Sequence, residues 1–166
     1  MEKYKYCPIC KKELIEKELE GRIRITCPDC VRIFYRNPLP ATAALAVNEQ
    51  GEILMIKRAV EPFKGQWCLP GGFVEMGESL AESVVRELSE ETGLSGKAGR
   101  FVGAHIQKSE MYGGVLVVGI EVITKDGTLT PGDDAEEAKF VPIDKIPDIP
   151  FETHRKLIEE YMLSRD

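Results

Sequence analysis

The sequence predicts an α/β sandwich of mixed strands, with one helix in the middle and another at the end, preceded by a small metal-stabilised appendage. Apolar runs typical of strands are interrupted by one helical segment and followed by another. Four cysteines form two Cys-x2-Cys pairs near the N-terminus, and a double glycine leads towards the first helical segment. The 166 residues suffice for one full core and an appendage. We therefore expect two units, residues 1–36 and residues 37–166.

The appendage is predicted to be a zinc ribbon. Its two Cys-x2-Cys pairs are separated by 16 residues, which is typical of a four-thiolate tetrahedral site with the ligands Cys7, Cys10, Cys27 and Cys30. Bound zinc supplies folding energy that so small a segment lacks. The alternative, a pair of redox-active Cys-x-x-Cys motifs, is disfavoured by the presence of two matched copies. The ribbon then serves as folding support or as a contact in a homodimer.

The larger unit is predicted to begin after a stiff, proline-containing linker at residues 37–40. Its apolar runs predict strands at residues 41–47, 53–57, 101–108 and 115–124 and through 139–141. Residues 48–51 carry a hairpin signal, and residues 125–128 are expected to close another hairpin. Residues 152–163 predict a closing helix with an apolar stripe.

The central helix is predicted between Ser79 and Gly93. Ser79 is followed three residues later by Glu82, which is the pattern of a capping box. Gly93 provides a C-terminal stop. Apolar residues at helical spacing form a stripe beside a row of carboxylates, so one face of the helix can pack on a sheet while the other borders a cleft.

Three carboxylates on this helix predict a metal site. Glu87, Glu90 and Glu91 stand at i, i+3 and i+4, so they share one face and repel each other unless a cation lies among them. A hard divalent cation with oxygen ligands removes that repulsion, and bound magnesium usually lies beside a substrate phosphate. Arg86 lies one turn before Glu90 and can fix it by a charge-assisted hydrogen bond. The alternative is a solvated acidic helix face.

The residues between Gly72 and Leu94 resemble the signature of the Nudix hydrolases. The pattern G-x5-E-x7-R-E-L-S-E-E-T-G-L matches at every fixed position, and the preceding Trp-Cys-Leu-Pro-Gly-Gly resembles the family's usual lead-in. The resemblance implies an α/β/α sandwich, in which the signature forms a loop–helix–loop. It also implies hydrolysis of a diphosphate linked to another moiety, with magnesium or manganese as the cofactor.

The resemblance also assigns roles to residues. It implies that the metal ligands are Glu87, Glu90, Glu91 and the backbone carbonyl of Gly71. Glu78 is expected to orient Arg86 or a metal ligand. The general base stays open between these glutamates and the carboxylates of the acidic loop at residues 133–137, which can equally be a solvated turn.

Substrate contacts are predicted at Arg58, Trp67, Gly72 and Tyr112. Arg58 ends a strand where a phosphate can lie, although an exposed strand end is the alternative. Gly72 lets the backbone approach a ligand closely. Trp67, Phe73 and Tyr112 can stack on an adenine, whereas packing against the core is the other interpretation.

A ribbon ahead of a Nudix domain resembles the NADH pyrophosphatases and a group of ADP-ribose and FAD pyrophosphatases. The first group has an S-Q-P-W-P-F-P-type element after the signature, but residues 95–130 contain no proline. The C-terminal part from residue 131 is more similar to the ADP-ribose and FAD group. We therefore expect a small nucleotide substrate, ADP-ribose first and FAD or NADH next, with release of AMP. The alternatives are a pyrophosphohydrolase for capped RNA 5′ ends and a catalytically silent nucleotide sensor.

Composition limits the partners. The net charge is −6, with nine Lys/Arg against six Asp/Glu in residues 1–36 and a formal −9 in the rest. A unit of charge −9 is a poor non-specific binder of nucleic acid, which we therefore do not expect as a partner. No apolar run approaches the roughly 20 residues that span a bilayer, and the N-terminus begins no signal segment. We expect a cytoplasmic protein without a membrane partner.

Overall fold

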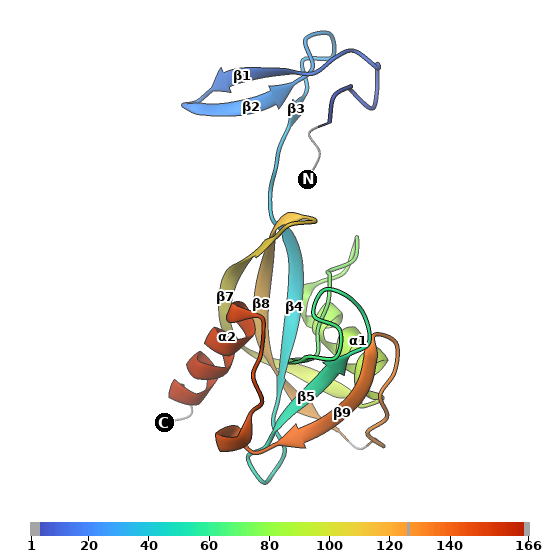
Figure 1. Ribbon diagram of the computed structural model, residues 1–166, viewed down its shortest axis with the longest axis vertical. Coiled ribbons are helices and arrows are strands. Elements are labelled where there is room, and N and C mark those ends of the chain that lie inside the picture. The colour runs from blue at the N-terminus through green and yellow to red at the C-terminus, as the bar shows by residue number, and fades with distance from the viewer. Residues whose placement is uncertain (1–3, 126, 165–166) are drawn as a thin grey trace.

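The N-terminal residues form a small antiparallel sheet set apart from the larger body (Figure 1). The computed structural model describes residues 4–125 and 127–164. The small sheet contains β1 (Ile15–Leu19), β2 (Arg22–Thr26) and β3 (Ile33–Phe34), in that order. Glu20 and Gly21 make the turn between the first two strands, and both have positive φ, at 51° and 71°. One extended segment leads from this sheet into the body.

The strands of the body form two sheets of three. In the first, β4 is parallel to β8 and β8 is antiparallel to β7, so this sheet is mixed: β4 (Leu39–Ala46), β7 (Gly96–Ser109), β8 (Gly113–Thr124). The second is antiparallel in the order β6-β5-β9: β5 (Ile53–Arg58), β6 (Trp67–Cys68), β9 (Ala135–Val141). Pro40 lies within β4 because β4 is an edge strand of its sheet, where a missing N–H is tolerated.

Both predicted helices are present. The helix α1 (Leu80–Thr92) begins after Ser79, whose side chain forms the expected capping box with Glu82. It ends at Gly93, whose φ of 69° is left-handed. The helix α2 (Glu152–Leu163) closes the fold and follows a short 3-10 helix, η1 (Ile143–Lys145). Neither helix, within the part of the chain that the structure describes, is long and apolar enough to cross a membrane.

The period-2 alternation of β4 and β8 divides the core between the two helices. Ala43, Leu45, Val115 and Val117 share one apolar cluster with the α2 residues, including Leu157. The neighbouring alternate positions share the other cluster with α1: Ala44, Ala46, Val118, Ile120, Val122, Val84, Leu88. The sheet therefore has a helix on each face, which is the α/β/α sandwich expected from the sequence (Figure 1).

Two predictions about strand pairing are wrong. Residues 48–51 do form a turn, but an isolated bridge between Val47 and Ile53 is all that joins the flanking strands before β4 and β5 enter different sheets. Residues 125–128 do not close a hairpin between β8 and β9, because β9 pairs with β5; residue 126 of this segment lies outside the described residues. A turn signal is local, whereas the choice of partner strand depends on the whole sheet.

Candidate functional site

The double glycine before α1 lets the backbone lie against β4 and Glu87. A Cβ at Gly71 would lie 2.1 Å from the carbonyl oxygen of Thr42, and a Cβ at Gly72 would lie 2.5 Å from Oε1 of Glu87. The carbonyls of Pro70 and Gly72 accept hydrogen bonds from β4. The carbonyl of Gly71, between them, accepts none from the residues that the structure describes. This oxygen is therefore free to contact a ligand.

The Glu91 carboxylate is buried beside this loop, with 3% of the residue exposed. Its Oε2 accepts a hydrogen bond of 2.8 Å from the backbone N–H of Gly71. Burial raises its pKa to about 8, and the neighbouring charges of Glu87 and Asp134 also raise it, against the opposing effects of the Gly71 N–H and Arg58. Within the described residues, no cationic side chain forms an ion pair with this buried carboxylate.

Arg86 holds the other acidic residues of the site together. Its Nε and Nη2 donate to both carboxylate oxygens of Glu78, at 2.8 and 3.0 Å. Its Nη1 donates to Glu87 and Glu90, at 2.8 Å each, and Nη2 also donates to the Phe73 carbonyl at 3.0 Å. The hydrogen bonds from Arg86 hold the pKa of Glu78 at about 2. Every terminal nitrogen of this guanidinium is engaged, so Arg86 orients the carboxylates and has little left for a ligand.

The chemistry of these donors suits a hard divalent cation, although among the described residues only the four cysteines already converge as a metal-ligand group. Burial also raises the pKa of Glu87, so two neighbouring acids on one helix face resist ionisation without further positive charge. Carboxylate and carbonyl oxygens are the ligands that magnesium prefers. Glu87, Glu91 and the free Gly71 carbonyl supply such oxygens from adjacent segments, and Glu90 lies on the same helix face.

A pH titration tests this charge deficit. In the absence of divalent metal, native Glu91 holds its proton up to about pH 8, whereas the unfolded chain releases it near 4.5. The native state therefore binds more protons in this window, and the contribution of Glu91 to unfolding free energy falls as pH rises, by up to about 1.4 kcal/mol per pH unit. Chemical denaturation in chelator at pH 5 to 9 should show this loss. We expect Glu91→Gln to flatten the profile; an unchanged slope would exclude Glu91 as its source.

Arg58 and the acidic loop border the Glu91 carboxylate from the second sheet. The backbone N–H of Ala59 donates to the Asp134 carbonyl at 2.7 Å, which joins the end of β5 to the loop before β9. The backbone N–H of Gly132 donates to the Glu91 carbonyl at 3.2 Å. The loop predicted as a source of the general base thus lies next to α1. Its Glu137, however, is paired with Lys57 at 2.7 Å.

The aromatic residues predicted to contact substrate lie in different surroundings. The Lys139 ammonium lies 4.1 Å from the Trp67 ring centroid, and the ring also packs against the core, so one face of Trp67 is already covered. Tyr112 is a partly exposed residue in the β7–β8 loop and packs edge to face with Phe73, with centroids 5.1 Å apart. Tyr112 therefore lies near the glycine loop, whereas Trp67 makes packing contacts with the core and with Lys139.

Three further residues near Arg58 were not singled out from the sequence. Phe63 meets Phe151 edge to face, with centroids 5.0 Å apart, and Phe151 stacks on His154 at 5.0 Å. Burial lowers the pKa of His154 to about 3, and its Nδ1 accepts a hydrogen bond from the Leu69 N–H at 3.2 Å. No sequence signal marks these residues, because the β5–β6 loop that carries Phe63 is distant along the chain from Phe151 and His154 at the start of α2.

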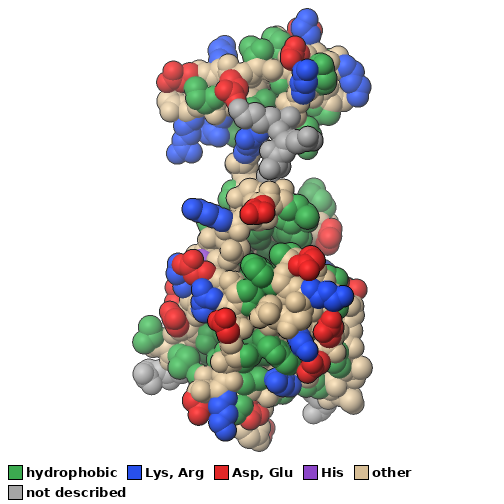
Figure 2. All heavy atoms as spheres, in the orientation of Figure 1, with side chains coloured by type: hydrophobic (Ala, Val, Ile, Leu, Met, Phe, Trp, Pro, Cys, Tyr) green, Lys and Arg blue, Asp and Glu red, His purple; other side chains and the backbone are tan. Residues whose placement is uncertain are grey.

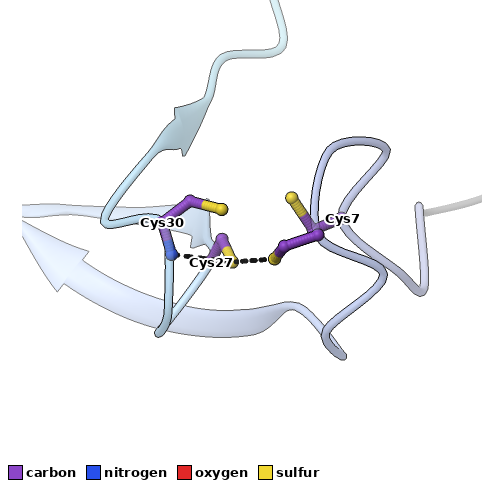
Figure 3. Close-up of side chains that lie close together, drawn as sticks. Cys7, Cys27 and Cys30 are labelled. Carbon is purple, nitrogen blue, oxygen red and sulfur yellow. Dashed lines mark hydrogen bonds between the residues drawn. The ribbon is translucent and has the colours of Figure 1, made fainter.

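The four predicted zinc ligands lie close together in the ribbon, and Figure 3 labels three of them, Cys7, Cys27 and Cys30. Their Sγ atoms all lie within 4.8 Å of one another, and those of Cys10 and Cys27 are 3.4 Å apart. Tetrahedral zinc with bonds of about 2.3 Å separates sulfurs by about 3.8 Å. The cluster is therefore placed to hold a metal ion.

The two cysteine knuckles share one backbone design. The N–H of Cys7 donates to the Lys12 carbonyl and the N–H of Cys27 donates to that of Arg32, at 2.8 and 2.9 Å. The fifth residue of each knuckle, Lys11 or Val31, has positive φ. This repetition supports two equivalent halves of one metal site.

Comparison with known proteins identifies the class. The model of the NUDIX domain matches residues 37–161. An ADP-ribose pyrophosphatase from Methanocaldococcus jannaschii is 40% identical over 129 residues, which cover 77% of this chain and 75% of that protein. The NAD-capped RNA hydrolase NudC of Pseudomonas aeruginosa is 26% identical over 97% of this chain, which spans 56% of that protein. The crystal structure of a NUDIX hydrolase from Nitrosomonas europaea superposes with a TM-score of 0.82, at 28% identity and 97% and 92% coverage.

The chain belongs to the Nudix family. The prediction of a Nudix pyrophosphatase is confirmed by the family match and by these relatives. Enzymes of this family use divalent metals and act on small nucleotides, in agreement with the donor set beside Gly71.

Proposed function

We propose that this enzyme hydrolyses the diphosphate of ADP-ribose and releases AMP and ribose 5-phosphate, with FAD and NADH as secondary substrates. The observation that carries the proposal is the 40% identity to the M. jannaschii ADP-ribose pyrophosphatase over three quarters of each chain. The complete set of acidic residues around Arg86 supports turnover rather than silent nucleotide binding.

Glu87, Glu90, Glu91 and the Gly71 carbonyl would hold magnesium or manganese in this proposal. When bound, such ions neutralise phosphate charge, lower the pKa of water and align the attacking and leaving groups. The Gly71 N–H holds the Glu91 carboxylate beside the glycine loop, where this carboxylate and the Gly71 carbonyl would both be available to the metal. The burial of Glu91 strengthens its attraction for a cation, because screening by water is weak there.

Arg86 and Glu78 are positioning residues. The bidentate pair between them fixes the guanidinium, which in turn holds Glu87 and Glu90 in place. Gly72 leaves space for Glu87. Arg58 is the proposed contact for the substrate diphosphate, and Tyr112, which packs against Phe73, is a second proposed contact beside the glycine loop.

The ribbon, residues 1–36, is proposed to be a separate structural unit ahead of the catalytic unit, residues 37–166. Zn²⁺ held by the four cysteines would stabilise it. Figure 2 shows many of its Lys and Arg side chains on the surface, and several large apolar side chains are also exposed, among them Tyr6, Ile23 and Tyr35. This surface is compatible with a contact in a homodimer.

A capped RNA is the second candidate substrate. The NudC similarity extends over nearly the whole chain, ribbon included, and that relative is an NAD-capped RNA hydrolase. The four thiolates and Zn²⁺ carry a formal −2 that offsets most of the ribbon's +3, which disfavours tight binding of the RNA chain. Affinity that falls steeply with salt would favour this candidate.

A substrate panel tests the proposal. The purified protein is incubated with magnesium and with ADP-ribose, FAD, NADH, diadenosine polyphosphates, nucleoside triphosphates or NAD-capped RNA, and products are separated by chromatography. We expect the highest kcat/KM for ADP-ribose, with AMP and ribose 5-phosphate in equal amounts. A higher kcat/KM for nucleoside triphosphates than for ADP-ribose, or for capped RNA than for free NADH, would contradict the proposed function.

A further inference from the structure

Arg58 carries a positive charge that no carboxylate within the described residues neutralises. Its Nε donates to the Pro62 carbonyl at 2.7 Å and its Nη2 to the Glu61 carbonyl at 3.4 Å. These neutral partners fix the guanidinium but leave its charge available. The backbone N–H of the neighbouring Ala59 donates to the Asp134 carbonyl, and Gly132 of the same loop donates to the Glu91 carbonyl, so Arg58 lies beside the proposed site of diphosphate cleavage. Arg86, in contrast, is saturated by Glu78, Glu87 and Glu90.

The same guanidinium borders an aromatic cluster. Its Cζ lies 5.5 Å from the Phe151 ring centroid, and the ring of His154 stacks on Phe151 at 5.0 Å. Phe151 is thus packed between a cation and a buried histidine. Phe63, which meets the Phe151 ring at an angle of 88°, is 43% exposed. The cluster therefore presents the partly exposed ring of Phe63, which packs against Phe151.

The backbone of Phe63 is strained. Its φ is 63°, in the left-handed region that large side chains rarely adopt, and its carbonyl accepts from the Gln66 N–H at 3.0 Å. A phenylalanine that needs this conformation and stays 43% exposed gains less from burial than a core residue does. Such strain persists at sites where the side chain serves a ligand.

The geometry points to Phe63 as the platform on which the nucleobase of the substrate stacks, with Arg58 on the adjoining phosphate. The inference rests on the proposed function and extends it by naming the residue that selects a substrate with an aromatic base. Phe151 is a positioning residue, because its ring supports Phe63 and packs under Arg58. Bases stack on exposed aromatic rings through their π-faces. The free charge of Arg58 suits the phosphate attached to the ribose that carries the base.

The rival platform is the pair Phe73 and Tyr112. It also lies beside the glycine loop, but the nearest guanidinium, Arg86, donates to the Phe73 carbonyl and to three carboxylates. This guanidinium is already engaged by those partners and has no free charge to offer the phosphate of a nucleotide placed there. Trp67 is disfavoured because Lys139 already covers a face of its ring.

Calorimetric titration with the two expected products, AMP and ribose 5-phosphate, tests the inference. Phe63→Asn removes the ring but keeps a residue that tolerates left-handed backbone, so the fold should be retained. We expect Kd for AMP to rise about tenfold, which corresponds to about 1.4 kcal/mol, while Kd for ribose 5-phosphate stays unchanged. The comparison variant is Tyr112→Asn, in the rival pair, and the matched control is Phe101→Asn, at another exposed ring on β7, for which both Kd values should stay unchanged.

Several results would contradict the role of Phe63 as the base platform. Loss of AMP affinity in Tyr112→Asn but not in Phe63→Asn would overturn the inference, as would equal weakening of both ligands in Phe63→Asn. Turnover of ADP-ribose by the unaltered protein, measured in parallel, tests the proposed function separately. Normal turnover with an unchanged Kd for AMP in Phe63→Asn would reject the base platform and leave the hydrolase function standing.

Discussion

Glu91→Gln should lower kcat for ADP-ribose by more than about a hundredfold in saturating magnesium. Outer-shell partners of metal ligands alone typically cost about 10- to 100-fold, and Glu91 is a proposed ligand. The variant keeps the shape of the side chain and can still accept the Gly71 N–H, so its fold is retained. Steady-state kinetics measures kcat, and circular dichroism checks that the variant is folded. Glu90→Gln should behave alike.

The matched control is Glu82→Gln on the same helix. Glu82 belongs to the capping box at Ser79 and lies outside the Arg86 network, and glutamine also serves in capping boxes. Its kcat should therefore stay within about twofold of the unaltered enzyme, whereas the Glu91 variant should not. Full activity of both Glu90→Gln and Glu91→Gln in magnesium would show that these carboxylates do not hold a catalytic metal.

Cys7→Ser should reduce bound zinc from about one ion per chain to none. Structural zinc contributes about 10–16 kcal/mol in small finger peptides, and the ribbon has only three short strands with mostly exposed residues. We expect the ribbon to unfold. The catalytic unit has its own two-sided core, so ADP-ribose turnover should persist. Metal analysis and hydrogen exchange of residues 4–36 measure the two effects.

Cys68→Ser provides the comparison. Cys68 is buried beside Ile56 and Ala135 in the body, and burial raises its thiol pKa to about 12, so it is an inert thiol remote from the cluster. This variant should retain its zinc. A zinc content unaffected by Cys7→Ser, or a fully protected ribbon without zinc, would remove the structural role assigned to the metal.

Local patterns predicted the parts of the site that lie close together in sequence. Ser79, Glu82 and Gly93 delimit α1 as expected, and the carboxylates after Arg86 share its face, because helix geometry converts spacing into position. The cysteine knuckles likewise repeat a local turn. The contact of Phe63 with Phe151, by contrast, depends on where α2 packs, and no spacing encodes it. The pairing of β9 with β5 was missed for the same reason.

The alternation along β4 has a consequence for the fidelity of folding. Even-numbered side chains enter the layer under α1 and odd-numbered ones the layer under α2, while Thr42 and Ala44 bind the glycine loop through their backbone N–H groups. A slip of one residue would exchange the two layers and shift the loop's anchoring points together. A misregistered β4 would therefore lose both its core packing and its hydrogen bonds to the glycine loop. The correct alignment of β4 and the correct position of the glycine loop thus depend on each other.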